Sequence, residues 1–169
     1  MRFLLCVAGG FALAGLYHSQ ASATPAQDCK KPVYLTFDTG HMAVAPVIAD
    51  ILARQKVVVT FFAANEKTKE GDGSLGEHWG GWWRERAKEG HEFASHTFNH
   101  VYWVADAGKD AFRVKPSAGS RQGETYILDR NGYCEELSQS SRRLQMLTGK
   151  SPLPLFRAPG GRLSPSLEL

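Results

Sequence analysis

The chain of 169 residues carries 20 Lys and Arg against 17 Asp and Glu, which leaves a formal net charge of +3. This near-neutral balance, with no long basic stretch, predicts that the protein binds neither nucleic acid nor an acidic membrane surface. The length is enough for one domain with a buried core.

The first 23 residues have the pattern of a signal peptide rather than of a folded domain. Arg2 is their only fixed charge, the apolar run 3–16 is too short to span a bilayer, and Ala21-Ser22-Ala23 is a small-residue cleavage pattern. We predict cleavage after Ala23, a linker over residues 24–31 and one domain over 32–169. Export to the periplasm or the extracellular space follows, with no stable membrane insertion after cleavage. An uncleaved membrane anchor is the alternative.

Two cysteines remain once Cys6 leaves with the signal peptide. Cys29 and Cys134 are an even pair, and exported proteins mature in an oxidising compartment. A disulfide between them and two free or buried thiols are both compatible with the sequence, because spacing alone does not show whether their Cα atoms approach each other.

The first half of the domain alternates between strand and helix patterns. Residues 31–37 are apolar, β-branched and aromatic and predict a strand that ends at Asp38. Apolar residues at three- and four-residue intervals predict a helix over 44–52, and the run 56–64 predicts a second, fully buried strand. The Gly- and Asp-rich stretch 67–76 is expected to be a loop.

The second half continues this alternation with one interruption. A helix is expected over 77–88, a strand over 91–95, and a long loop or insertion over the polar residues 104–131. A further helix around 133–147 should end at Gly149, and a fourth strand is expected over 154–157. Such alternation predicts an α/β fold with a largely parallel sheet.

Polar side chains able to do chemistry follow three of the four predicted strands. These are Asp38, His96 and Arg157. In α/β folds the loops at the carboxyl ends of parallel strands carry the chemistry, so we expect the three side chains to form one site.

His96 and His100 are four residues apart, a spacing that a helical turn places on one face. Two neutral imidazoles there would suit a divalent metal such as zinc. A purely structural histidine pair has the same spacing, and only the position after a strand favours the metal.

Asp38 and Arg157 are predicted to act as a general base and as the residue that orients it. A carboxylate beside metal-activated water can take the proton of the attacking water during amide hydrolysis. An Asx turn at Asp38 and a loop-bracing role for Arg157 are the plainer alternatives.

Three segments together resemble the polysaccharide deacetylase (NodB homology) family. They are Thr36-Phe37-Asp38-Thr39-Gly40, His96-Thr97-Phe98-Asn99-His100 and Arg157-Ala158-Pro159-Gly160-Gly161. The resemblance implies a distorted (β/α) barrel, incomplete in this chain, with Asp38 as general base, His96 and His100 as metal ligands and Arg157 orienting the base. It also implies a carbohydrate substrate such as chitin oligomers, peptidoglycan, acetylated xylan or exopolysaccharide.

The chain departs from the family pattern in two places. Thr39 stands where the family has an Asp that ligates the metal, and a hydroxyl is a weaker zinc ligand; His41 is a possible substitute. The later motifs, which carry the general acid, are not found before Leu169. We therefore expect weak activity or none from these 169 residues alone.

Three functions remain open at this point: a metal-dependent carbohydrate deacetylase, a carbohydrate-binding domain without activity, and a hydrolase of a non-sugar amide. Four intact residues of the family's site favour the first. Trp79, Trp82 and Trp83 are expected to belong to the core, whereas Tyr102 and Trp103 follow His100 and are candidates for sugar contact.

Overall fold

A computed structural model describes residues 31–167, and all helices and strands belong to one compact unit, Val33–Leu169. The predicted signal peptide and Cys29 lie outside the described residues, so cleavage, export and the disulfide stay predictions. Cys134 is exposed and unpaired among the residues that the structure describes. No helix within this range is both long and apolar enough to cross a membrane.

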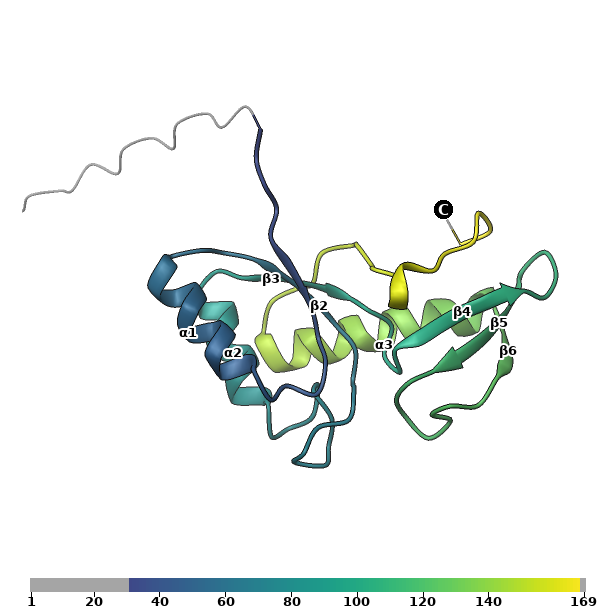
Figure 1. Cartoon of the computed structure of the whole chain (residues 1–169), viewed down its shortest axis with the longest axis horizontal. Coiled ribbons are helices and arrows are strands. Elements are labelled where there is room, and N and C mark those ends of the chain that lie inside the picture. The colour runs from purple at the N-terminus through teal and green to yellow at the C-terminus, as the bar shows by residue number, and fades with distance from the viewer. Residues whose placement is uncertain (1–30, 168–169) are drawn as a thin grey trace, which may run out of the picture. The chain divides into compact units, whose positions relative to one another are not determined.

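A three-stranded parallel sheet forms one part of the fold (Figure 1). Its order is β1 (Thr36–Asp38), β2 (Thr60–Ala63) and β3 (Glu92–Ser95). The helices α1 (Ala45–Gln55) and α2 (Gly80–Lys88) form the crossovers between them. Because the strands are parallel, their carboxyl ends lie at one edge, which confirms the predicted α/β arrangement.

Aromatic side chains fill the core beside this sheet. The Phe61 ring lies 5.9 Å from Phe37 and 6.3 Å from Phe93 and meets Trp82 and Trp83 edge-on. Trp83 is fully buried, and Trp79 and Trp82 pack half-buried against the same cluster, so the expected core role of the tryptophans is confirmed.

The first two strands are shorter than the sequence predicts. Val33 and Tyr34 are 92% and 83% exposed, and β1 begins only at Thr36, opposite Thr60. Ahead of β2, Lys56 adopts a left-handed conformation that ends α1, and Val58 remains exposed. Apolar residues there lack a neighbouring strand, and strand propensity alone does not make one.

Residues 104–131 were predicted to be a long loop or an insertion, and the prediction of a loop is wrong. The region holds an antiparallel sheet of β4 (Val101–Asp106), β5 (Ala111–Pro116) and β6 (Tyr126–Asp129). Along β5, Phe112 and Val114 are buried while Arg113 and Lys115 are exposed. This alternation belongs to a strand with one face on a core, and its charged half made the segment resemble a loop.

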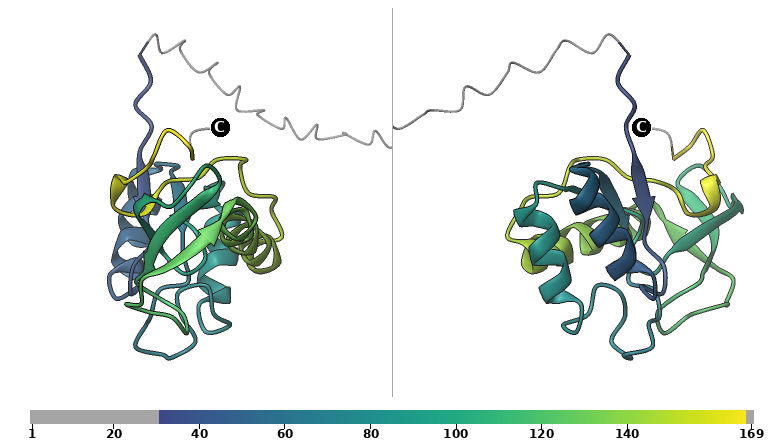
Figure 2. Two further views of the ribbon diagram at one scale, coloured as in Figure 1. Left: turned by 90° about the vertical axis from the view of Figure 1, so that its right-hand side faces the viewer. Right: turned by 60° about the vertical axis from the view of Figure 1, so that its left-hand side comes forward.

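The long helix α3 (Arg130–Thr148) packs against both sheets (Figure 2). Near its start Tyr133 joins Phe112 in the cluster of the antiparallel sheet, and near its end Leu144 and Leu147 join the cluster of the parallel sheet. The helix ends at Gly149 as predicted, where φ is 70°.

The predicted fourth strand over 154–157 forms only one bridge, between Phe156 and Ser95. Pro152 and Pro154 lack backbone N–H groups, so a continuous ladder cannot form. Two hydrogen bonds still hold the segment beside β3: Ser95 N donates to Leu155 O at 3.2 Å and Arg157 N to Ser95 O at 3.0 Å. A short 3-10 turn, η1 (Pro159–Gly161), follows.

Candidate active site

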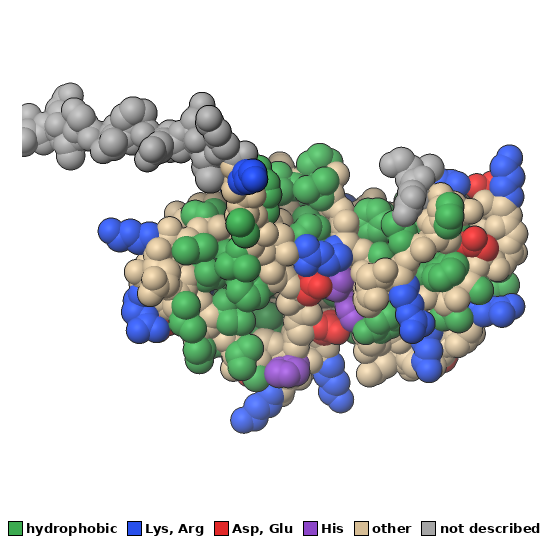
Figure 3. Space-filling view, turned by 45° about the horizontal axis from the view of Figure 1, so that its top comes forward, with side chains coloured by type: hydrophobic (Ala, Val, Ile, Leu, Met, Phe, Trp, Pro, Cys, Tyr) green, Lys and Arg blue, Asp and Glu red, His purple; other side chains and the backbone are tan. Residues whose placement is uncertain are grey.

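The carboxyl edge of the parallel sheet brings the four predicted site residues together. Asp38 ends β1, His96 follows β3, and Arg157 lies beside the end of β3. In the space-filling view, acidic, basic and histidine side chains gather at the centre of this face (Figure 3).

The two histidines are joined by a turn rather than by the helical turn that the sequence suggested. Thr97 and His100 have φ values of 60° and 49°, a left-handed conformation that is costly for residues other than Gly. Hydrogen bonds hold it: Thr97 Oγ1 accepts from Val101 N at 2.7 Å, and Thr97 N donates to Ser95 Oγ at 3.2 Å. The turn brings the two Nε2 atoms to 3.2 Å from each other.

Both imidazoles are buried and therefore neutral near pH 7. Burial lowers the pKa of His96, and burial together with the neighbouring His96 lowers the pKa of His100 to about 4. His96 Nδ1 lies 2.7 Å from the carbonyl oxygen of Arg157. A carbonyl only accepts, so Nδ1 of the neutral ring carries the hydrogen and the Nε2 lone pair is available.

Asp38 is held by Arg157. Arg157 Nη1 donates to Asp38 Oδ1 at 2.7 Å, Nη2 donates to Thr36 Oγ1 at 2.7 Å, and the guanidinium lies 4.2 Å from the centre of the Phe62 ring. The other carboxylate oxygen, Oδ2, lies 3.8 Å from His96 Nε2. The ion pair thus fixes one oxygen of Asp38 and leaves the second facing the histidines.

The histidine pair fits a divalent metal as two of its ligands. Zinc–nitrogen bonds of about 2.0–2.1 Å at a tetrahedral angle separate two nitrogens by about 3.3–3.4 Å. The observed Nε2–Nε2 separation of 3.2 Å is close to this value. Within residues 31–167, however, no three His, Cys, Asp or Glu side chains are gathered closely enough to form a complete metal site.

Neither Thr39 nor His41 completes the set of ligands. Thr39 Oγ1 accepts from Ala64 N at 2.8 Å and donates to Ala64 O at 3.2 Å, so its hydroxyl links β1 to β2. His41 Nδ1 accepts from Ala43 N at 3.3 Å, just before α1. The Thr39 hydroxyl and the His41 Nδ1 atom are thus hydrogen-bonded to nearby backbone groups.

Sequence reasoning missed two polar residues beside His100. Its Nδ1 lies 2.5 Å from Ser117 Oγ and 3.4 Å from Glu66 Oε1. Burial raises the pKa of Glu66, although Ser117 and the nearby His41 oppose this. Glu66 follows β2, so the strand-end rule that selected Asp38 could have found it. Ser117 follows β5, in the segment predicted to be a loop or insertion, and no sequence pattern indicated a role for it.

The two aromatic residues after His100 point in different directions. The Tyr102 ring meets the His100 ring edge-on at 4.9 Å, whereas Trp103 packs against the cluster of the antiparallel sheet and donates from Nε1 to Asp106 Oδ1 at 3.1 Å. Successive residues of a strand face opposite sides. Of the two candidates for sugar contact, only Tyr102 lies at the site.

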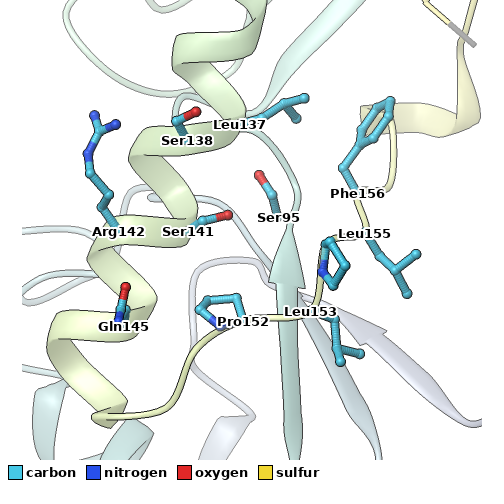
Figure 4. Close-up of a pocket in the computed structure, with 11 residues that line it drawn as sticks. Ser95, Leu137, Ser138, Ser141, Arg142, Gln145, Pro152, Leu153, Leu155 and Phe156 are labelled. Carbon is cyan, nitrogen blue, oxygen red and sulfur yellow. The ribbon is translucent and has the colours of Figure 1, made fainter. Parts of the chain in front are cut away.

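Two surface pockets flank the site residues. A pocket of about 230 Å³ runs from Asp38 past His41 to Trp82. A larger groove of about 490 Å³ lies between α3 and residues 152–156 (Figure 4). The groove contains none of the four predicted site residues, so the smaller pocket is the one connected with the candidate chemistry.

The sequence was compared with known protein families and with curated proteins. The sequence profile described as polysaccharide deacetylase matches residues 26–168. A chitooligosaccharide deacetylase of Azorhizobium caulinodans is 26% identical over 133 residues, which are 78% of this chain and 49% of that protein. The chain therefore spans about half the length of this curated relative.

Solved structures share the fold at low sequence identity. The catalytic domain of a peptidoglycan N-acetylglucosamine deacetylase from Eubacterium rectale matches with a TM-score of 0.53 and 22% identity over 88% of this chain and 54% of that one. A family 4 carbohydrate esterase pseudoenzyme from Bacillus anthracis matches with a TM-score of 0.53 and 16% identity over 79% and 37%. The fold corresponds to part of the (β/α) barrel of these proteins.

Proposed function

The chain belongs to the polysaccharide deacetylase family, and we propose that it provides the base and the metal-binding histidines of a hydrolase that removes N-acetyl (or other acyl) groups from a carbohydrate polymer. A divalent metal such as zinc is the proposed cofactor, held by His96 and His100. The proposed location is the periplasm or the extracellular space, in keeping with the signal-like residues 1–23.

The observation that carries the proposal is the geometry around His96. Two neutral Nε2 atoms converge at 3.2 Å, and a carboxylate oxygen of Asp38 lies 3.8 Å from one of them. A fold-stabilising ion pair would not need two buried, neutral imidazoles facing each other beside an oriented carboxylate. A hydrolytic site needs both.

The residues have separate tasks in this mechanism. A divalent metal, when bound, supplies Lewis-acid chemistry that polarises the acyl carbonyl and lowers the pKa of water. Asp38 Oδ2 accepts the proton of the attacking water, while Arg157 keeps Oδ1 in place through its 2.7 Å hydrogen bond. Among residues 31–167 we assign none as the acid that protonates the leaving amine.

A carbohydrate-binding domain without activity is the second candidate. It is favoured by one observation, the Thr39 hydroxyl that stands in place of a ligand carboxylate and is already bonded to Ala64. The same pocket beside Asp38 would then hold a sugar without hydrolysing it.

Replacing Asp38 by Asn tests the proposed reaction. Asn keeps the shape of the side chain and an acceptor oxygen but cannot take a proton, so acetate release by the full-length protein from N-acetylated chitin and peptidoglycan oligomers should fall by about 10²- to 10⁴-fold. Sugar binding and zinc binding should persist. The measurement is an acetate-release assay with added zinc, alongside calorimetric titration.

Asp50→Asn is a matched control, because Asp50 forms only an exposed ion pair with Arg54 on α1. If parent and Asp38→Asn release acetate equally fast, Asp38 is not the base. If the full-length parent binds the oligomers but releases no acetate with any divalent metal, the binding domain replaces the deacetylase.

Thr39→Asp tests whether the missing carboxylate limits metal binding. An Asp carboxylate can accept from Ala64 N as Thr39 does but cannot donate to the Ala64 carbonyl, so one of its two oxygens is left for a metal held by the histidines. Zinc affinity should rise by at least tenfold in calorimetric titration, and His96→Ala should abolish binding. An unchanged affinity in Thr39→Asp would show that position 39 does not face the metal.

A further inference from the structure

The side chains of His100, Ser117 and Glu66 form a polar cluster on the Nδ1 side of the His100 ring, away from His96. Ser117 Oγ lies 2.5 Å from Nδ1, and Glu66 Oε1 lies 3.4 Å from the same atom. Both oxygens thus lie beside the same ring nitrogen. The three residues come from the turn after β3, the end of β5 and the loop after β2.

Backbone hydrogen bonds fix Glu66 and Ser117 in place. Glu66 N donates to Ser74 Oγ at 3.0 Å, and Ser74 N donates back to Glu66 O at 2.8 Å, with Ser74 fully buried. Ser117 N donates to His100 O at 3.1 Å. These bonds fix the backbone at both positions, and the Glu66 side chain itself is only 21% exposed.

The 3.2 Å contact between the two Nε2 atoms leaves His100 a choice of tautomer. His96 keeps its hydrogen on Nδ1, so His100 can either donate from Nε2 to His96 or keep its own hydrogen on Nδ1. When His100 donates from Nε2, neither Nε2 atom has a lone pair free for a metal. When His100 keeps its hydrogen on Nδ1, both Nε2 lone pairs are free. A carboxylate beside Nδ1 favours the second, because a donor there is attracted to it.

We propose that Glu66 is a positioning residue which, together with Ser117, holds the His100 hydrogen on Nδ1 and so keeps the Nε2 lone pair directed toward the metal position. Ser117 Oγ accepts the hydrogen of His100 Nδ1 at 2.5 Å, and Glu66 Oε1 lies 3.4 Å from the same nitrogen. The inference rests on the proposed function, since it assigns the pair to a metal.

The test compares Glu66→Gln and Ser117→Ala with the parent, and Glu124→Gln serves as control because Glu124 forms only an exposed ion pair with Arg121. Nitrogen-15 NMR of the metal-free protein reports the imidazole tautomers, with the His100 signal assigned from a His100→Asn spectrum. Calorimetry with zinc reports affinity, and thermal unfolding confirms that each variant is folded.

In the parent and in Glu124→Gln we expect the Nδ1–H tautomer at His100. In Glu66→Gln the Nε2–H tautomer should gain population and zinc should bind about 10- to 100-fold more weakly. Ser117→Ala should weaken zinc binding less, because Glu66 can then approach Nδ1 directly, and Ser117→Thr, which keeps the hydroxyl, should restore it.

Two results would overturn the positioning role while leaving the proposed function standing. One is a parent that binds zinc together with a Glu66→Gln variant of equal affinity and unchanged tautomer. The other is weaker zinc binding in Glu66→Gln without any change of tautomer and with no effect of Ser117→Ala, which would make Glu66 a direct ligand. If the parent itself binds no divalent metal, the metal-dependent function fails, and the positioning role fails with it.

Discussion

The two sheets of this protein are built on different principles, although one helix serves both. The parallel sheet β1–β3 is covered by aromatic residues around Phe61, whereas the antiparallel sheet β4–β6 packs one face on a smaller cluster that includes Phe112 and Tyr133. The parallel sheet supplies Asp38 and His96, and the antiparallel sheet supplies Ser117 behind His100. Reactive groups thus come from strand ends of the first sheet and a supporting group from the second.

The direction of the strands explains why the two sheets contribute different groups to the site. Parallel strands direct their carboxyl ends to one edge, so side chains that follow them converge. An antiparallel sheet spreads its strand ends over both edges and contributes single residues to a neighbouring site. We therefore expect damage to the parallel core to remove the site, and damage to the antiparallel core to weaken it.

The largest effect is expected from Phe93→Ala. Phe93 is fully buried, stacks on Phe61 and meets Trp83 edge-on at 5.8 Å. Loss of the ring should lower the free energy of unfolding by about 3–5 kcal/mol and abolish zinc binding at moderate temperature. Denaturant unfolding followed by fluorescence measures this, with the exposed Val58→Ala as control. A loss below about 1 kcal/mol would contradict a shared aromatic core.

Phe112→Ala is the matched change in the antiparallel sheet. Phe112 is also fully buried, but within residues 31–167 its one aromatic partner is Tyr133, at 5.8 Å. The free energy of unfolding should fall by about 3 kcal/mol, at the lower end of the range for such changes, and zinc should bind more weakly because β5 carries Ser117. Two separate unfolding transitions, or full zinc affinity in this variant, would show that the sheets are independent.

A smaller effect, confined to the parallel sheet, is expected from acid. His91 is buried in that core, and its Nδ1 accepts from Val59 N at 3.1 Å. Burial lowers the pKa of His91 below its ordinary value of 6.5, so the unfolded chain binds a proton that the folded chain does not. Stability is thus full above pH 6.5 and is lost as the pH falls below it, by up to about 1.4 kcal/mol per pH unit.

His91→Asn isolates this contribution, because an Asn side-chain oxygen can accept the same hydrogen bond but does not titrate. The free energy of unfolding of the variant should fall less steeply than that of the parent between pH 6.5 and 5. Parallel slopes for the two proteins would show that His91 is not the group responsible. His96 and His100 titrate in both proteins, so their effect cancels.

The pattern of residues predicted much of the parallel half. Buried parallel strands are apolar on both faces, so β2 and β3 were recognisable, and the strand-end rule selected Asp38, His96 and Arg157, which the structure brings together. The same rule would have found Glu66 after β2. The antiparallel sheet was not predicted, because charged residues such as Arg113 and Lys115 alternate with the buried residues of β5. Gly and Pro residues in the same region also gave it the composition of a loop.

By itself, the sequence determined the alternation of strands and helices, the end of α3 at Gly149, and the identity of the groups able to do chemistry, because these depend on local periodicity and on single side chains. Only the tertiary structure decided how those groups are used. A left-handed turn rather than a helix places His100 against His96. The Thr39 hydroxyl is hydrogen-bonded to the backbone of Ala64. Glu66 and Ser117, which belong to segments distant in the sequence, lie next to His100. Such contacts join residues far apart in the chain, and no local pattern encodes them.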